Sequence, residues 1–222
     1  MGGPNPELPV QRGVVDTHCH VISGDETRYP MNPLGGKPSP WSRERPVDGP
    51  GLLLAMDAAG VQQAVVVQAS TCYGHDNRLV QDSTNASGGR LVGVYSVDLL
   101  GITPVAEIER WQSAGLAGTR FFIAGHTAAD HSTRLDDPRA APVWAHLEKT
   151  GVPVCIQIRA DGLSQLVNVL SRWPGLTVLL DHLARPELAD GPPYLAAGAL
   201  WDLASHPGLY FKYTTHNVRE SA

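Results

Sequence analysis

The sequence lacks the features that mark secreted, membrane or nucleic-acid-binding proteins. Only three of its 222 residues are cysteine, and none form a Cys-x-x-Cys pair. Such a sparse set is typical of a protein in a reducing compartment and does not indicate a disulfide framework. No secretory signal is visible and no apolar run approaches the length of a membrane span, so we expect a cytoplasmic protein without a membrane partner. The formal net charge of -5 is not that of a nucleic-acid-binding surface, but it does not exclude an anionic small substrate.

Short apolar runs alternate with helical stretches along the chain. The predicted strands are Val14–His18, Gln63–Ala69, Leu91–Val97, Gly118–Phe122, Val152–Ile158, Thr177–Asp181 and Leu209–Tyr213. The predicted helices cover residues 52–59, 103–114, 137–150, 163–172 and 194–205. This order predicts an α/β fold, a TIM-like (β/α) barrel over residues 13–222 that lacks its eighth β/α unit, after an N-terminal extension of residues 1–12.

Two segments are too long for ordinary connections between strands and helices. Residues 23–50 are rich in proline and glycine and contain Trp41 and Arg45, which predicts a functional loop after the first strand. Residues 122–137 form a second long loop, whose histidines His126 and His131 are interpreted as surface residues.

Two histidines, His18 and His20, end the first predicted strand with one residue between them. Residues i and i+2 of a strand point to the same face, so both rings should project side by side from its carboxyl end. Such a pair can bind a divalent metal or share a proton near neutral pH, although His-x-His alone is also common in solvated loops. Asp16 has the same parity and is predicted to orient one of the imidazoles.

Further polar side chains follow the other predicted strands, at the edge of a parallel sheet that carries the site. They are Ser70, Tyr73 and His75 after the second strand, Arg120 on the fourth, Gln157 and Arg159 on the fifth, and His182 after the sixth. His182 is the strongest candidate, because it follows a buried strand and an aspartate. For Arg120, pairing with a surface carboxylate is an equally good interpretation, and one of Gln157 and Arg159 could simply be solvated.

Five motifs occur in order along the chain. They are Asp16-Thr17-His18-Cys19-His20, Gln68-Ala69-Ser70, Gly74-His75-Asp76-Asn77, Gly118-Thr119-Arg120-Phe121-Phe122 and Asp181-His182-Leu183-Ala184-Arg185-Pro186. Together they resemble the amidohydrolase superfamily in its amidohydrolase-2 branch, nearest to the 2-pyrone-4,6-dicarboxylate lactonase-like members. The resemblance extends from about residue 14 to the last residue.

The resemblance implies a TIM-like barrel enzyme, a hydrolase whose activated water attacks a small carboxylated lactone or related cyclic ester. It implies that His18, His20 and His182 are catalytic, and that they either hold one divalent metal ion, zinc or manganese-like, or act without a metal. Arg120 would bind a substrate carboxylate. The full set of residues expected to bind substrate is Arg120, Ser70, Tyr73, His75, Gln157 and Arg159.

Three departures from the family pattern leave alternatives open. Gln157 or Arg159 stands where many relatives have a metal-ligand histidine, and the second carboxylate-binding arginine is not placed, with Arg134 in the corresponding loop. The strand-eight aspartate, the general base, has no counterpart, and Asp181 and His216 are weak substitutes. We therefore expect a truncated form, a barrel that another chain completes (a homo-oligomer is one form of this), or an inactive ligand-binding protein. A decarboxylase of an aromatic or unsaturated acid is a further alternative, which the missing strand-five histidine disfavours.

Overall fold

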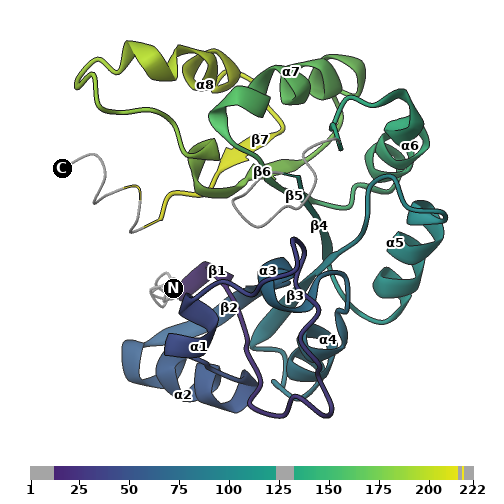
Figure 1. Cartoon of the computed structure of the whole chain (residues 1–222), viewed down its shortest axis with the longest axis vertical. Helices are drawn as coiled ribbons and strands as arrows, with labels where there is room; N and C mark the ends of the chain where they lie inside the picture. The colour runs from purple at the N-terminus through teal and green to yellow at the C-terminus, as the bar shows by residue number, and fades with distance from the viewer. Residues whose placement is uncertain (1–12, 124–132, 215–216, 218–222) are drawn as a thin grey trace, which may run out of the picture.

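The computed structural model describes residues 13–123, 133–214 and 217. Its core is one seven-stranded parallel sheet in the order β1-β2-β3-β4-β5-β6-β7, so every strand pairs with its neighbours in sequence. The sheet curls into an open arc with helices on its outer side (Figure 1). No pairing joins β1 to β7 within the described ranges, which agrees with the predicted barrel that lacks its eighth unit. The extension 1–12 and His126, His131 and His216 lie outside these ranges.

All seven predicted strands are present. They are β1 (Val14–Cys19), β2 (Val61–Val67), β3 (Leu91–Ser96), β4 (Gly118–Phe122), β5 (Val154–Gln157), β6 (Val178–Leu180) and β7 (Leu209–Phe211). The central strands are buried on both faces, which is why they read as near-continuous apolar runs. The two outer strands are more open, since Val14 of β1 and Tyr210 of β7 are 56% and 58% exposed.

The helices lie between consecutive strands. They are α1 (Trp41–Glu44), α2 (Gly49–Ala59), α3 (Ser70–Tyr73), α4 (Arg78–Asn85), α5 (Pro104–Ser113), α6 (Ala141–Thr150), α7 (Leu163–Arg172) and α8 (Gly198–Leu203), with 3₁₀ turns η1 (Pro138–Ala140), η2 (Ala160–Gly162), η3 (Asp181–Ala184) and η4 (Leu195–Ala197). Local chemistry sets their ends: Asp48 accepts a hydrogen bond from the Gly51 amide to begin α2, and Gly60, with a φ of 68°, ends it.

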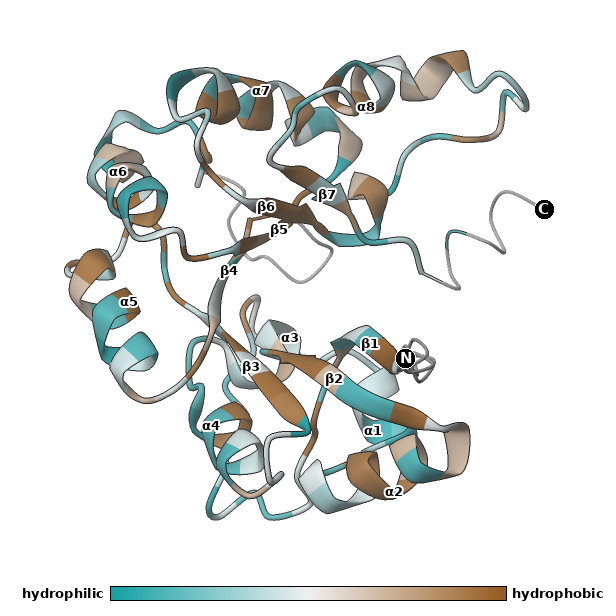
Figure 2. Cartoon of the chain, turned by 180° about the vertical axis from the view of Figure 1, so that it is seen from behind, coloured by the Kyte–Doolittle hydropathy of each residue, from teal (hydrophilic) through white to brown (hydrophobic). Residues whose placement is uncertain are grey.

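The core fills the space between the sheet and its helices. In Figure 2 strand β6 is hydrophobic along its length and β3 over much of it, whereas α5 and α7 alternate hydrophobic and hydrophilic residues. Trp144 of α6 is fully buried and packs edge-on against Phe121 of β4, with ring centroids 5.2 Å apart. The helices therefore pack against the sheet and leave the carboxyl ends of the strands for other contacts.

Within the described ranges, no helix is long and apolar enough to cross a membrane.

Two short helical turns were not predicted from the sequence. Helix α1 lies inside the proline-rich segment after β1, and α3 directly follows β2. Four-residue turns of this kind have too few residues for a detectable hydrophobic period, so the sequence pattern cannot reveal them. Both turns lie near the histidine pair and shape its surroundings.

Candidate functional site at the carboxyl ends of the strands

Three predicted histidines meet above the sheet. The Nε2 atoms of His18 and His20 are 3.2 Å apart, and their rings stand at 86° to each other. His182, from the turn after β6, has its ring centroid 5.0 Å from that of His18. Segments more than 160 residues apart in sequence thus bring three imidazoles together, as the arrangement of strand ends predicts.

His20 has a fixed orientation. Its Nδ1 lies 2.7 Å from the carbonyl oxygen of Val67, so Nδ1 carries the proton and donates it to that acceptor. The indole of Trp41 stacks on the ring, with centroids 5.4 Å apart and an angle of 23°. The long segment after β1 therefore contributes a wall to the site, as its prediction as a functional loop implies.

A buried charge network lies beneath the histidines. Asp181, at the end of β6, is fully buried and its Oδ2 accepts hydrogen bonds from Nε and Nη2 of Arg120 at 3.2 and 3.0 Å. Its Oδ1 lies 3.1 Å from Nζ of Lys212 and 3.4 Å from Nδ1 of His18. The carboxylate near the histidine ring is thus Asp181, whereas Asp16 accepts a hydrogen bond from the His18 backbone amide.

Arg120 is engaged by the protein itself. Besides Asp181, its Nη1 donates to the carbonyl oxygen of Gln68 at 2.8 Å and its Nη2 donates to Oε1 of Gln157 at 3.1 Å. The side chain is 3% exposed, so its partner is a buried carboxylate and not a surface one. Its role in binding a substrate carboxylate stays a prediction, and in this structure most of its donors are already occupied.

Burial determines the charge state of the three histidines. It lowers the pKa of His18, lowers that of His20 well below the ordinary value, and lowers that of His182 to about 4. Burial opposes ionisation of Asp181, yet the positive charge of Arg120, with His18 and Lys212, holds the pKa of Asp181 well below its usual range. At neutral pH the site therefore presents neutral imidazoles above an ionised carboxylate.

The turn that carries His182 has an unusual backbone. Residues 182–185 all have positive φ, at 54°, 55°, 56° and 50°, a left-handed turn built without glycine. Each such residue costs about 1–2 kcal/mol. The carbonyl oxygen of His182 accepts hydrogen bonds from the Arg185 amide at 2.9 Å and from Asn217 Nδ2 at 3.1 Å. A strained backbone of this kind persists only where the surrounding contacts hold the residues in place, and such residues cluster at functional sites.

The histidines open onto a cavity of about 530 Å³. Of the predicted site residues, the cavity is lined by His18, His20, His182, Arg120, Gln157 and Arg159. It also has walls that were not assigned a role from sequence: Trp41, Arg45, Thr71, Phe122, Arg185 and Thr214. The guanidinium groups of Arg45, Arg159 and Arg185 make its mouth cationic. Arg185 was part of a recognised motif, so its place in the motif was the signal that could have identified it.

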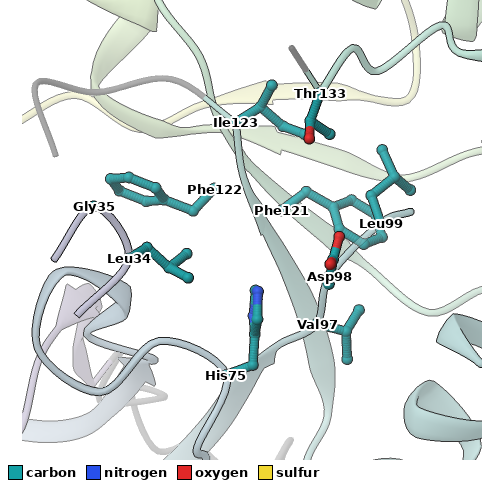
Figure 3. Close-up of a pocket in the computed structure, with 10 residues that line it drawn as sticks. All are labelled: Leu34, Gly35, His75, Val97, Asp98, Leu99, Phe121, Phe122, Ile123 and Thr133. Carbon is teal, nitrogen blue, oxygen red and sulfur yellow. The ribbon is translucent and has the colours of Figure 1, made fainter. Parts of the chain in front are cut away.

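Three predicted residues lie elsewhere. Ser70 is fully buried and donates to Oγ of Ser96 at 3.3 Å, and Tyr73 accepts a hydrogen bond from the Ser23 amide at 2.9 Å. His75 lines a separate cavity of about 230 Å³, and Figure 3 shows its ring directed into that cavity, with Phe121 and Phe122 beyond it. Their predicted contact with substrate stays a prediction that the shape of the larger cavity does not support.

Arg134, the loop arginine considered as the second carboxylate-binding residue, also lies apart from the histidines. Arg134 pairs with Asp136 at 2.9 Å and lines a third cavity with Arg159. Arg185, on the same turn as His182, lines the cavity onto which the histidines open.

The donor set does not match a divalent ion. The Nε2 atoms of His18 and His20 already form a hydrogen bond, and the cation Lys212 lies behind His18 at 3.2 Å. Across residues 13–123 and 133–214, no group of three or more His, Cys, Asp or Glu side chains is arranged to hold a metal ion. The predicted zinc or manganese-like ion therefore stays a prediction, although the rings lie close together.

A curled parallel sheet with histidines and arginines at the carboxyl ends of its strands defines a barrel-type α/β protein with a polar site in one mouth. The chain belongs to the amidohydrolase family, whose model matches residues 15–218. Members of this family generally use a divalent metal ion.

Two curated relatives are similar in sequence. A 2-pyrone-4,6-dicarboxylate hydrolase from Comamonas testosteroni is 31% identical over 188 residues, which cover 84% of this chain and 56% of the relative. A 4-sulfomuconolactone hydrolase from Rhizobium radiobacter is 25% identical over 210 residues, covering 92% and 64% respectively. The chain thus spans less than two thirds of the length of either relative.

Solved structures share the fold. A probable 2-pyrone-4,6-dicarboxylic acid hydrolase from Acinetobacter baumannii, with citric acid bound, superimposes with a TM-score of 0.73 at 18% identity, covering 94% of this chain and 76% of the other. A zinc-bound amidohydrolase from Burkholderia multivorans gives 0.69 at 22%, covering 90% and 68%. A 2,6-dihydroxybenzoate decarboxylase from Rhizobium gives 0.63 at 14%, covering 94% and 83%. At these identities the likeness shows the fold.

Proposed function

We propose that this chain forms the site of a hydrolase that opens a small lactone carrying carboxylate groups. The observation that carries the proposal is the meeting of His18, His20 and His182 over one cavity with a cationic mouth. The two curated relatives, whose names describe hydrolysis of a pyrone dicarboxylate and of a sulfomuconolactone, support a substrate with a cyclic ester and at least one anionic group.

The electrostatics of the cavity suit such a substrate. The neutral imidazole of His182 can donate an N–H to the lactone carbonyl and stabilise the negative charge that develops when water attacks. Arg159 and Arg185 lie in the cavity wall, where planar guanidinium groups bind carboxylates through paired hydrogen bonds. Water adds to the carbonyl carbon and loses a proton, the ring C–O bond breaks, and the released oxygen takes up a proton in its place.

Asp181 is not suited to activate that water. It is fully buried, Arg120 engages one of its oxygens, and Lys212 lies beside the other. A carboxylate whose pKa is held low by two cations is a weak acceptor of protons. Its role in this proposal is to hold the charge network beneath the histidines.

The test is a ring-opening assay with 2-pyrone-4,6-dicarboxylate and 4-sulfomuconolactone, followed by ultraviolet absorbance. We expect turnover of at least one of them by the chain and a loss of about 10²-fold or more in the His182→Asn variant. A parallel assay measures carbon dioxide release from 2,6-dihydroxybenzoate. Carbon dioxide release without ring opening would favour a decarboxylase, and calorimetric binding of either lactone without turnover would favour an inactive ligand-binding protein.

A further inference from the structure

Lys212 is a buried cation in contact with the histidine cluster. It follows β7 and is 5% exposed. Its Nζ donates hydrogen bonds to Nδ1 of His18 at 3.2 Å and to Sγ of Cys155 at 3.0 Å, and it lies 3.1 Å from Oδ1 of Asp181. An ammonium group has three N–H donors and no acceptor capacity, so each of these three partners receives or faces one donor.

These contacts determine which nitrogen of His18 carries the proton. Two candidates compete at Nδ1: Lys212 as a donor, and Asp181 as an acceptor at 3.4 Å. Within the described residues Oδ1 of Asp181 lies farther from this ring nitrogen than Nζ of Lys212 does, at 3.4 Å against 3.2 Å, and its geometry is the poorer one for a hydrogen bond. Because Lys212 has no acceptor, Nδ1 of His18 must accept from it, and the His18 proton resides on Nε2.

The partner histidine is consistent with this assignment. His20 carries its proton on Nδ1, where it donates to the Val67 carbonyl oxygen, so its Nε2 has a lone pair. An Nε2–H on His18 then donates to that lone pair across 3.2 Å. The opposite tautomer of His18 would place two lone pairs at this distance, an arrangement that needs a cation between them.

We propose that Lys212 is a positioning residue that fixes the Nε2–H tautomer of His18. The His18–His20 pair is thereby a donor–acceptor pair, and the lone pair that His18 would offer to a metal ion is replaced by an N–H. Lys212 also contributes the positive charge that Asp181 faces. Its meaning for catalysis rests on the proposed function, whereas the tautomer itself is independent of it.

The tautomer can be measured directly. Long-range ¹H–¹⁵N correlation spectra of the ¹⁵N-histidine-labelled chain at pH 7 separate protonated from unprotonated ring nitrogens, and the His18→Gln variant identifies the His18 signals. We expect an unprotonated Nδ1 and a protonated Nε2 for His18. A protonated Nδ1 in the unmodified chain would overturn the proposal, and the variant serves only to assign the signals.

Replacement of Lys212 gives a second readout. In Lys212→Met we expect the His18 proton to move to Nδ1, toward Asp181, and zinc affinity measured by calorimetry to rise at least tenfold. Lys149→Met removes an exposed lysine of α6 and should match the unmodified chain in both measurements. An unchanged tautomer or unchanged zinc affinity in Lys212→Met would contradict the proposal. Absence of lactone turnover with the expected tautomer would instead refute the proposed function alone.

Discussion

Arg120 and Asp181 form a buried ion pair that joins β4 to the turn after β6, with Nη2 of the arginine 3.0 Å from Oδ2 of the aspartate. The two side chains are 3% and 0% exposed. Burial of two charges is costly, and the pair is retained here together with His18 and Lys212. The pair therefore fixes the position of the end of β6 beneath the histidines. It also places two of the buried charges of the site there.

Removal of one partner of this pair should be strongly destabilising. We expect Arg120→Met to lower the free energy of unfolding by about 3–5 kcal/mol, because it leaves a buried carboxylate with too little compensating charge. Arg78→Met, which breaks an exposed pair with Asp76, should cost about 1 kcal/mol or less. Urea unfolding followed by circular dichroism compares the two variants, and equal losses would show that burial does not set the cost.

Acid should destabilise the protein before its carboxylates titrate. The folded-state pKa of His182 is about 4 against 6.5 in the unfolded chain, so the unfolded state binds more protons as the pH falls from 6.5 to 4. The free energy of unfolding should therefore decrease across this window, by about 3 kcal/mol from His182 alone. His18 and His20 act in the same direction. Urea titrations at several pH values should show a shallower decrease in His182→Asn, and an identical slope would contradict the assignment.

His182 should matter more for activity than for stability. We expect His182→Ala to abolish measurable lactone hydrolysis, a loss of at least about 10²-fold in kcat, because a group that stabilises developing charge is removed. The thermal unfolding midpoint should change little, since the half-buried ring contributes limited packing. The matched control is His206→Gln, because His206 lies near the amino end of β7. Unchanged turnover in His182→Ala would remove this residue from the mechanism.

The left-handed turn should tolerate glycine unusually well. Ala184 has a φ of 56°, whereas Ala140 has a φ of −78°, and both are fully buried. Both Ala→Gly changes remove the same methyl group and add the same flexibility to the unfolded chain, but only the first relieves strain. We expect Ala184→Gly to be less destabilising than Ala140→Gly by about 1–2 kcal/mol in urea unfolding. A larger loss at Ala184 would mean that the turn is unstrained.

The cationic mouth of the cavity should act on substrate binding. Arg159→Gln removes one guanidinium from the cavity wall, and we expect KM for an anionic lactone to rise about tenfold with kcat nearly unchanged. Arg172→Gln removes an exposed arginine that stacks on Trp173, and its KM should equal that of the unmodified chain. Steady-state kinetics measure KM for the two variants, and equal KM values would exclude Arg159 from substrate binding.

The sheet could be predicted from sequence because its signal is local. Runs such as Ala64-Val65-Val66-Val67 mark strands buried on both faces, and Gly60 and Gly151 end helices by adopting positive φ. The histidine cluster followed from the rule that the site lies at the carboxyl ends of parallel strands. Features that a local sequence pattern determines could therefore be predicted without a structure.

The partners within the site could not be predicted in the same way. Which side chain faces Arg120 depends on the register between β4, β5 and β6, and this register places Asp181 and Gln157 beside it. Lys212 lies within the last predicted strand, Leu209–Tyr213, where parity alone does not show that its side chain reaches His18. The left-handed turn at residues 182–185 contains no glycine, so the usual sequence signal for positive φ is missing.

The stacking of Trp41 on His20 gives the protein an intrinsic optical probe of its own site. Trp111 and Trp144 are buried in the core and report on folding, whereas the Trp41 indole lies in the cavity wall. Anything that enters the cavity or tilts the imidazole changes the surroundings of that indole. Occupancy can therefore be followed by fluorescence without a label, even for compounds that are never converted.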